Sequence, residues 1–375
     1  MEKNYPKSTL DTELVRRSQS FSDRTRRMHT SQEDIYHNRC HNPNSTQENR
    51  VLKVAENVLD LIGSTPMIKL VFPEIRANVY AKLEYMNPGG SVKDRIAKQM
   101  IEAAERRGVT KPGDTIVEAT SGNTGIGLSM VGAAKGYRVV IVMPATASAE
   151  RRSVMKHYGA HVVLTPSTDF VEGALTKARE LAKRPGWWMP SQFENMDNVA
   201  AHMENTGKEI LKQVPSGSVE AFVAGIGTGG TLMGVGRALR RINPKVRIVA
   251  VEPVGSRSCE PKRVTKHLEI IDHQVEGIGD GFIPPIVKTD LIDEWARVTD
   301  EDAIETACCL AREKGLFVGI SSGANVYAAK QVAESLGKGR NVVTILPDSA
   351  DRYYTTGLFR ASCCKKASHD ESTLD

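Results

Sequence analysis

Long apolar segments are absent from this chain of 375 residues. No apolar run approaches the roughly 20 residues that a membrane-spanning helix needs, and the N-terminus lacks the hydrophobic region of a secretory signal peptide. Six cysteines are present, but their spacing is that of neither a zinc site nor a disulfide framework. These absences predict a cytoplasmic protein with no metal site, because thiols stay reduced in that compartment.

Strong charge bias is also missing. The formal net charge is +5, and no basic stripe alternates with aromatic residues, so neither nucleic acid nor a membrane is expected as a partner. Apolar residues make up 40% of the chain and charged residues 25%, which is typical of a globular protein with a sizeable core.

The two ends differ in composition from the rest of the chain. Residues 1–50 are polar and lack aliphatic periodicity, so we interpret them as a disordered leader. His37, Cys40 and His41 in this leader are ligand-type residues, but in a polar tail they are more often bystanders. Residues 361–375 are expected to form a second disordered tail, which leaves residues 51–360 as the folded unit.

Between the ends, short apolar segments alternate with amphipathic segments. The predicted strands cover residues 79–85, 115–119, 138–143, 161–164, 219–224, 246–251 and 341–346. The predicted helices cover residues 93–107, 149–158, 171–183, 198–213, 228–241, 301–314 and 321–336, and another follows the turn at 121–125 and ends at 136. Alternation of helices with buried strands predicts parallel sheets covered on both faces. Two successive runs predict two three-layer α/β domains, and an irregular loop over 252–300 is expected to border a site.

One lysine stands just inside a predicted helix start. Asn87-Pro-Gly-Gly90 is typical of a turn, and Ser91 can cap the helix that begins near Lys93. A cation in the first turn faces the positive end of the helix dipole, which favours a neutral and nucleophilic amine. A surface lysine is the common alternative for a lysine taken alone.

Four turns precede or follow predicted elements, at residues 120–124, 225–231, 319–323 and 347–353, and the first three contain glycine. The 225–231 turn would hold a phosphate on free N–H groups at a helix start. Its G-x-G-x-x-G pattern, followed by Glu252 after the next strand, also permits a dinucleotide site. The 120–124 turn offers hydroxyls and an amide that suit a carboxylate or phenolic oxygen, or simply cap a helix.

Taken together, these motifs favour a phosphorylated aldehyde cofactor, and over roughly residues 55–360 the chain resembles the fold type II pyridoxal-phosphate enzymes of the cysteine synthase and cystathionine β-synthase group. The matching motifs are Ile62-Gly-Ser-Thr-Pro66, Gly90-Ser-Val-Lys-Asp-Arg95, Thr120-Ser-Gly-Asn-Thr-Gly125, Gly227-Thr-Gly-Gly-Thr231, Gly319-Ile-Ser-Ser-Gly323 and Pro347-Asp-Ser349. The resemblance implies a tryptophan synthase β-like fold, with a smaller mobile subdomain at about 87–198 and a larger one from 51–86 and 199–360.

The resemblance also assigns site residues. Lys93 would form the Schiff base with pyridoxal 5'-phosphate and shuttle the Cα proton. The other cofactor-binding residues would be Asn123 at the phenolic oxygen, Ser321 at the ring nitrogen, and Gly227, Thr228, Gly229, Gly230 and Thr231 at the phosphate. The substrate carboxylate would be bound by Thr120, Ser121, Thr124 and Gln192.

A neutral serine at the ring nitrogen favours β-elimination over transamination, because the ring is then a poorer electron sink. The implied activity is cysteine synthase, which converts O-acetylserine and sulfide to cysteine and acetate through an aminoacrylate intermediate, in class EC 2.5.1. Cystathionine β-synthase-like activity stays open, because Asn87-Pro-Gly-Gly90 before the lysine is more similar to that enzyme. Cyanoalanine synthase activity stays open as well, because Ala147-Ser-Ala149 departs from the family pattern, as does Ala350-Asp351. A scaffold protein that captures the C-terminal peptide of a partner such as serine acetyltransferase is the alternative from another class. Relatives are typically homodimers.

Overall fold

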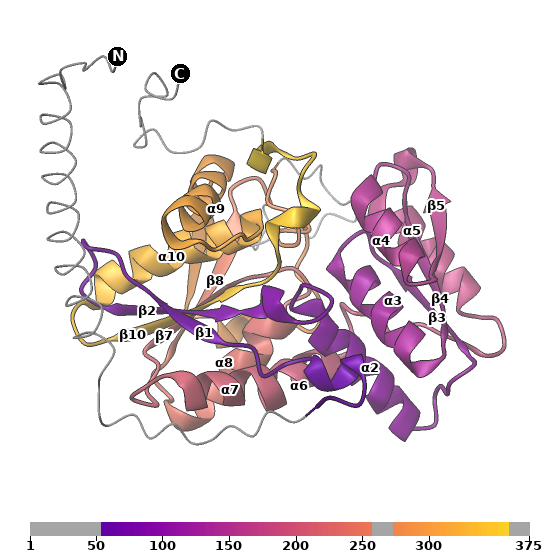
Figure 1. Ribbon diagram of the computed structural model, residues 1–375, viewed down its shortest axis with the longest axis horizontal. Coiled ribbons are helices and arrows are strands. Elements are labelled where there is room, and N and C mark those ends of the chain that lie inside the picture. The colour runs from indigo at the N-terminus through magenta and orange to yellow at the C-terminus, as the bar shows by residue number, and fades with distance from the viewer. Residues whose placement is uncertain (1–53, 257–272, 360–375) are drawn as a thin grey trace, which may run out of the picture. The chain divides into compact units, whose positions relative to one another are not determined.

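The computed structural model describes residues 54–256 and 273–359 (Figure 1). The predicted leader and tail, with His37, Cys40 and His41, lie outside the described residues. Within the described part, no helix is both long enough and apolar enough to cross a membrane.

A six-stranded sheet forms the larger of two layered regions. Its strands, in spatial order, are β1 (Met67–Leu70), β2 (Asn78–Leu83), β10 (Asn341–Leu346), β7 (Ala221–Gly225), β8 (Arg247–Pro253) and β9 (Glu294–Val298). Only β1 pairs antiparallel, with β2. The helices α9 (Asp300–Lys314) and α10 (Ile320–Leu336) pack on one face, and α7 (Gly207–Gln213) and α8 (Gly230–Ile242) pack on the other (Figure 1).

A four-stranded parallel sheet forms the second layered region. Its order is β5 (His161–Thr165), β4 (Arg138–Pro144), β3 (Thr115–Ala119) and β6 (Trp187–Trp188). One face is covered by α2 (Lys93–Arg106), α3 (Asn123–Lys135) and α4 (Ala149–His157), and the other by α5 (Phe170–Leu181). The structure therefore confirms the predicted α/β class, with one sheet wholly parallel and the other parallel except for β1. The predicted mobility and boundaries of the smaller subdomain stay a prediction.

Three strands were not predicted: β1, β6 and β9. Each is the last strand at a sheet edge. They have four, two and five residues, so each offers too few positions for a clear alternation of apolar and polar residues. The Glu294–Val298 strand falls inside the stretch predicted to be an irregular loop, and its burial alternates only partly.

The predicted helix over 198–213 is divided into three parts. They are α6 (Met196–Ala201), the π-helical turn η4 (His202–Thr206) and α7. Helix α8 packs closely against this segment: a Cβ on Gly234 of α8 would lie 2.4 Å from the Val199 carbonyl oxygen of α6. The buried ring of His202 bonds Thr206 within the turn at 3.0 Å. Hydrophobic periodicity does not show such a one-residue irregularity.

Candidate active site

The first turn of α2 places Lys93 at the junction of several loops. The Asn87–Gly90 turn closes with a 2.7 Å bond from the Gly90 N–H to the Asn87 carbonyl, with φ of +76° at Gly90. The Ser91 hydroxyl accepts the Lys93 N–H at 3.2 Å, as expected of a cap, although the helix formally begins after Val92. Burial lowers the pKa of Lys93, while the Asp280 and Asp348 carboxylates act to raise it. The Lys93 side chain is half-buried, and the lowered pKa favours its neutral, nucleophilic amine form.

A buried ion-pair cluster fixes this helix. Arg95 lies two residues after the lysine and pairs with Glu84 at 2.6 Å and with Glu209 at 2.8 Å. Lys82 joins the cluster through Glu209 at 2.6 Å. Although burial acts to raise the pKa of Glu84, the charge of Arg95 holds it below its ordinary value. Since β2, α2 and α7 each contribute, the cluster holds the start of α2 against the six-stranded sheet.

The glycine turn between β7 and α8 leaves no space for side chains. A Cβ at Gly227 would lie 2.2 Å from the carbonyl oxygen of Gly277, and one at Gly229 would lie 2.2 Å from Val287 Cγ2. Gly229 also has φ of +86°, which side chains rarely adopt. The turn therefore presents bare backbone N–H groups at the start of a 13-residue helix, an arrangement that binds phosphate.

Asn198 links this turn to a second one, and sequence reasoning missed it. Its Nδ2 donates to Thr228 Oγ1 at 3.0 Å and to the Gln192 carbonyl at 2.8 Å. Its Oδ1 is buried and has no partner among the described residues. Nothing in the local sequence marks Asn198, since its partners lie 30 residues ahead of it and six residues behind it.

The carboxylate-type turn lies between β3 and α3. Thr120 Oγ1 accepts the Gly122 N–H at 3.1 Å, and Thr124 Oγ1 donates to Gln192 Oε1 at 2.5 Å. Thr124 and Gln192 are buried, Thr120 is half-buried and Ser121 is exposed. The structure thus joins the side chains of Thr124 and Gln192, which are 68 residues apart in the sequence.

Asn123 makes contacts that the sequence did not predict. Its Nδ2 donates to Asp348 Oδ2 at 2.7 Å, and its Oδ1 accepts from Arg352. The hydroxyl of Tyr353 donates to the same Asp348 oxygen at 2.6 Å. The guanidinium of Arg151 on α4 lies 5.2 Å from the centre of the Tyr353 ring. The polar character of residues 347–353 was the only sequence signal for this network.

Ser321 occupies the first turn of α10 and is 3% exposed. The preceding Gly319 donates its N–H to the Asp348 carbonyl at 3.1 Å, and a Cβ on Gly319 would lie 2.3 Å from Asp348 Oδ1. The residue two positions before the predicted serine and the Asn123 network therefore both contact Asp348. The serine hydroxyl itself carries no charge.

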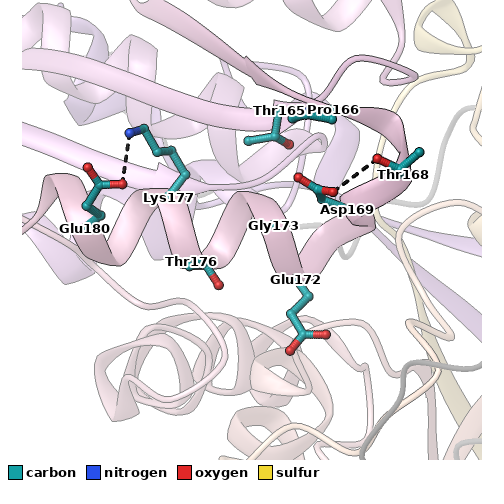
Figure 2. Close-up of a pocket in the computed structure, with 9 residues that line it drawn as sticks. All are labelled: Thr165, Pro166, Thr168, Asp169, Glu172, Gly173, Thr176, Lys177 and Glu180. Carbon is teal, nitrogen blue, oxygen red and sulfur yellow. Dashed lines mark hydrogen bonds and ion pairs between the residues drawn. The ribbon is translucent and has the colours of Figure 1, made fainter.

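Away from these loops, a surface pocket of about 590 Å³ runs from the end of β5 along α5. Figure 2 shows its lining, which is polar and includes the ion pair of Lys177 with Glu180 at 2.9 Å and the exposed Glu172. None of the predicted site residues lines it. This pocket therefore carries none of the chemistry described above.

Comparison with known proteins decides between the open alternatives. A family described as pyridoxal-phosphate dependent enzyme matches residues 58–348. This chain belongs to that family. Pyridoxal phosphate is therefore its cofactor, and the dinucleotide hypothesis is not supported. In agreement, Glu252 is 3% exposed and accepts a hydrogen bond from Ser256, so its carboxylate is not displayed for a ribose.

Relatives within the pyridoxal-phosphate family cover most of the chain. The chain is 50% identical to a cysteine synthase of Staphylococcus aureus over 309 residues, which are 82% of this chain and 98% of that protein. Its structure is similar to O-ureido-L-serine synthase, with a TM-score of 0.78, 42% identity and coverage of 83% and 96%. It is also similar to an O-acetylserine dependent cystathionine β-synthase of Helicobacter pylori, with a TM-score of 0.76, 38% identity and coverage of 82% and 100%.

The residues present fit the family's cofactor. The packed turn at Gly227 and Gly229 provides backbone donors where a side chain cannot stand. Lys93 provides an amine whose pKa burial lowers. The buried and unpartnered Oδ1 atoms of Asn198 and Asp348 are polar groups that a bound molecule or water would satisfy.

Proposed function

We propose that this protein is a cysteine synthase. It would replace the acetate group of O-acetylserine with sulfide, a transfer reaction of class EC 2.5.1. The identity to named cysteine synthases over nearly their whole length supports this proposal. The observation that carries it is Lys93, a half-buried amine of lowered pKa at a helix start, with anion-binding turns on separate helices around it.

Bound pyridoxal phosphate supplies an electron-withdrawing ring that makes the Cα proton of an amino acid removable. Lys93 would bind the cofactor covalently, and its amine would take the Cα proton and return it. The backbone of Gly227, Gly229 and Gly230 and the hydroxyls of Thr228 and Thr231 would hold the phosphate. Asn123 would orient the ring, and Ser321 would meet its nitrogen without adding charge.

The other turn would bind the amino acid. Thr124 and Gln192 already share a hydrogen bond, so either can turn towards a carboxylate with little cost in entropy. Thr120 and the exposed Ser121 would complete the set. We propose that the region of about 87–198 moves over the bound amino acid and excludes water.

The test compares the wild type with Lys93→Ala. The wild-type protein should be yellow and should form cysteine from O-acetylserine and sulfide. The variant should lose the colour and at least a hundredfold in rate, the lower end for loss of a proton-transfer group, while its thermal unfolding stays cooperative. A colourless wild type, or equal rates for both proteins, contradicts the proposal.

A second candidate follows from the open carboxylate turn. The same hydroxyls and amide that suit an amino-acid carboxylate also suit the C-terminal carboxylate of a partner peptide, such as that of serine acetyltransferase. A protein that binds such a peptide but forms no product from O-acetylserine, serine or cysteine would be a scaffold.

We further propose that the protein forms a homodimer and is located in the cytoplasm. Light scattering tests the first proposal, and cell fractionation tests the second.

A further inference from the structure

The loop that contains Gly277-Ile-Gly-Asp-Gly281 packs directly on the turn at residues 225–231, which is called the phosphate turn below. The Gly279 N–H donates to the Ile226 carbonyl at 2.9 Å, and the Gly279 carbonyl contacts His273 Nε2 at 2.9 Å. The Gly277 carbonyl fills the space beside Gly227. The residue before Asp280 is therefore bonded to the cofactor turn.

The residues after Asp280 reach the loop that contains Gln192. Phe282 packs edge-on against Phe193, with 5.2 Å between the ring centres, and Phe193 follows Gln192 in the chain. Asp280 thus stands between a hydrogen bond to the phosphate turn and a ring contact with the Gln192 loop, and the Gln192 side chain accepts from Thr124 of the carboxylate turn. The proposed substrate would occupy the same interval.

Asp280 differs from the other carboxylate near Lys93. Asp348 is buried, and its Oδ2 accepts bonds from Asn123 and Tyr353. Asp280 is half-buried, and among the described residues no hydrogen bond reaches its carboxylate. The charged groups that act on it are Lys93 and His273. Both carboxylate oxygens of Asp280 can therefore accept a proton from a third molecule.

We propose that Asp280 accepts the proton of a neutral thiol and so lets the protein use thiols as nucleophiles in addition to hydrosulfide. This inference rests on the proposed function and names a further class of nucleophile for it. The thiol S–H bond would break, with the proton passing to the Asp280 carboxylate and then to solvent. Acetate would leave the β-carbon with the C–O electron pair as the Lys93 amine takes the Cα proton. The sulfur electron pair would then form a C–S bond at that β-carbon, and Lys93 would return the proton to Cα.

The chemistry of the two nucleophiles supports the assignment. A free thiol has a pKa of about 8.5, so it is mostly protonated at neutral pH and gains from a base. Hydrosulfide already carries a negative charge, needs no base and is repelled by a carboxylate. Burial raises the pKa of Asp280, which makes its carboxylate a stronger base.

A competition experiment tests the proposal in the full-length holoenzyme. O-acetylserine is supplied with equal amounts of 2-mercaptoethanol and sodium hydrosulfide, and the thioether and cysteine products are measured by mass spectrometry. Asp280→Asn should lower the thioether-to-cysteine ratio at least tenfold, since general base catalysis contributes about 10² to 10⁴ in rate. A ratio does not depend on how much protein is folded.

Glu172→Gln is the matched control, because it removes an exposed carboxylate from α5 outside the proposed site. Its ratio should stay within twofold of the wild type. An unchanged ratio in Asp280→Asn, or cysteine without any thioether from the wild type, overturns this inference and leaves the proposed function intact. A wild type that forms neither product overturns both.

A second measurement does not depend on activity. Because Asp280 acts to raise the pKa of Lys93, Asp280→Asn should lower that pKa. In the full-length chain freed of cofactor, acetylation of Lys93 at pH 7 should then be at least threefold faster, since one pKa unit is a factor of ten. Equal labelling rates would show that Asp280 does not face Lys93, and would overturn the inference.

Discussion

The phosphate-type turn and the carboxylate-type turn both open a helix, but the chain packs around them differently. At Gly227, Gly229 and Gly230 an added Cβ would meet other atoms within 2.2 Å, including the Gly277 carbonyl. At Gly122 the nearest atom would be 3.9 Å away, and the neighbouring Ser121 is exposed. A bound cofactor benefits from a rigid, preformed turn, whereas a substrate that enters and leaves in every cycle needs an open one.

The largest expected effect contrasts Gly227→Ala with Gly122→Ala. The methyl group at residue 227 would overlap backbone that cannot move easily, so we expect a loss of about 3 kcal/mol in the free energy of unfolding and loss of most bound cofactor. The methyl group at residue 122 meets open space and should change stability by less than about 1 kcal/mol. Urea unfolding and the cofactor content of the purified proteins measure both effects. Equal behaviour of the two variants would remove the distinction between the turns.

A smaller effect is expected where the turns are joined. Asn198→Ala removes donors to Thr228 and to the Gln192 carbonyl, and a lost buried hydrogen bond costs about 1 to 3 kcal/mol. Cofactor dissociation and the KM for the amino acid should therefore both rise, each by about tenfold.

Asn205→Ala is the control, because within residues 54–256 and 273–359 the Asn205 side chain bonds only the Ala201 carbonyl of its own helical segment. It should leave the dissociation constant and the KM unchanged. If Asn198→Ala alters only one of these constants, the two turns work independently and Asn198 does not couple them.

A pH-dependent effect is expected beside the carboxylate turn alone. Burial raises the pKa of Glu118, on β3, to about 8, although the Ala119 N–H donates to its Oε1 at 3.2 Å. The unfolded chain releases this proton near pH 4.5. Between these values the unfolded state binds fewer protons than the folded state, so Glu118 lowers stability as pH rises, by up to about 1.4 kcal/mol per pH unit.

Glu118→Gln should flatten this decline of the free energy of unfolding with pH, because an amide does not titrate. The amide oxygen can still accept the Ala119 N–H. Urea unfolding at pH 5, 6, 7 and 8 measures the slope. Part of the slope should persist, since burial also raises the pKa of Asp94 to about 7. A variant with the wild-type slope would show that Glu118 is ionised in the folded protein throughout this range.

Most regular elements could be predicted from the sequence, because their signals are local. The α2 helix and the β3 and β10 strands have capping, glycine or continuous apolar patterns within their own residues, and the structure has them within a residue of the predicted bounds. The edge strands and the π turn were missed, because a single pairing edge and packing against α8 do not appear in periodicity.

The roles assigned by resemblance to Lys93, Asn123, Ser321 and the two turns stay predictions that the variants above test. Sequence could propose these residues because each sits in a short motif with its own turn chemistry. Asn198, Arg352 and Tyr353 could not be proposed, because their partners are distant in the chain. Asp280 lay in a loop expected to border a site, but its relation to Lys93 was invisible.

By itself, the sequence determined the α/β class, the glycine turns and the lysine at the start of α2, because each depends on neighbouring residues. Only the tertiary structure decided how the turns differ and which carboxylates face Lys93. Packing of the 277–281 loop closes the phosphate turn, and burial lowers the pKa of the lysine. The 277–281 loop lies about 50 residues along the chain from the turn that it packs on, and Asp280 lies almost 200 residues from Lys93. A local sequence pattern cannot encode contacts between segments so far apart.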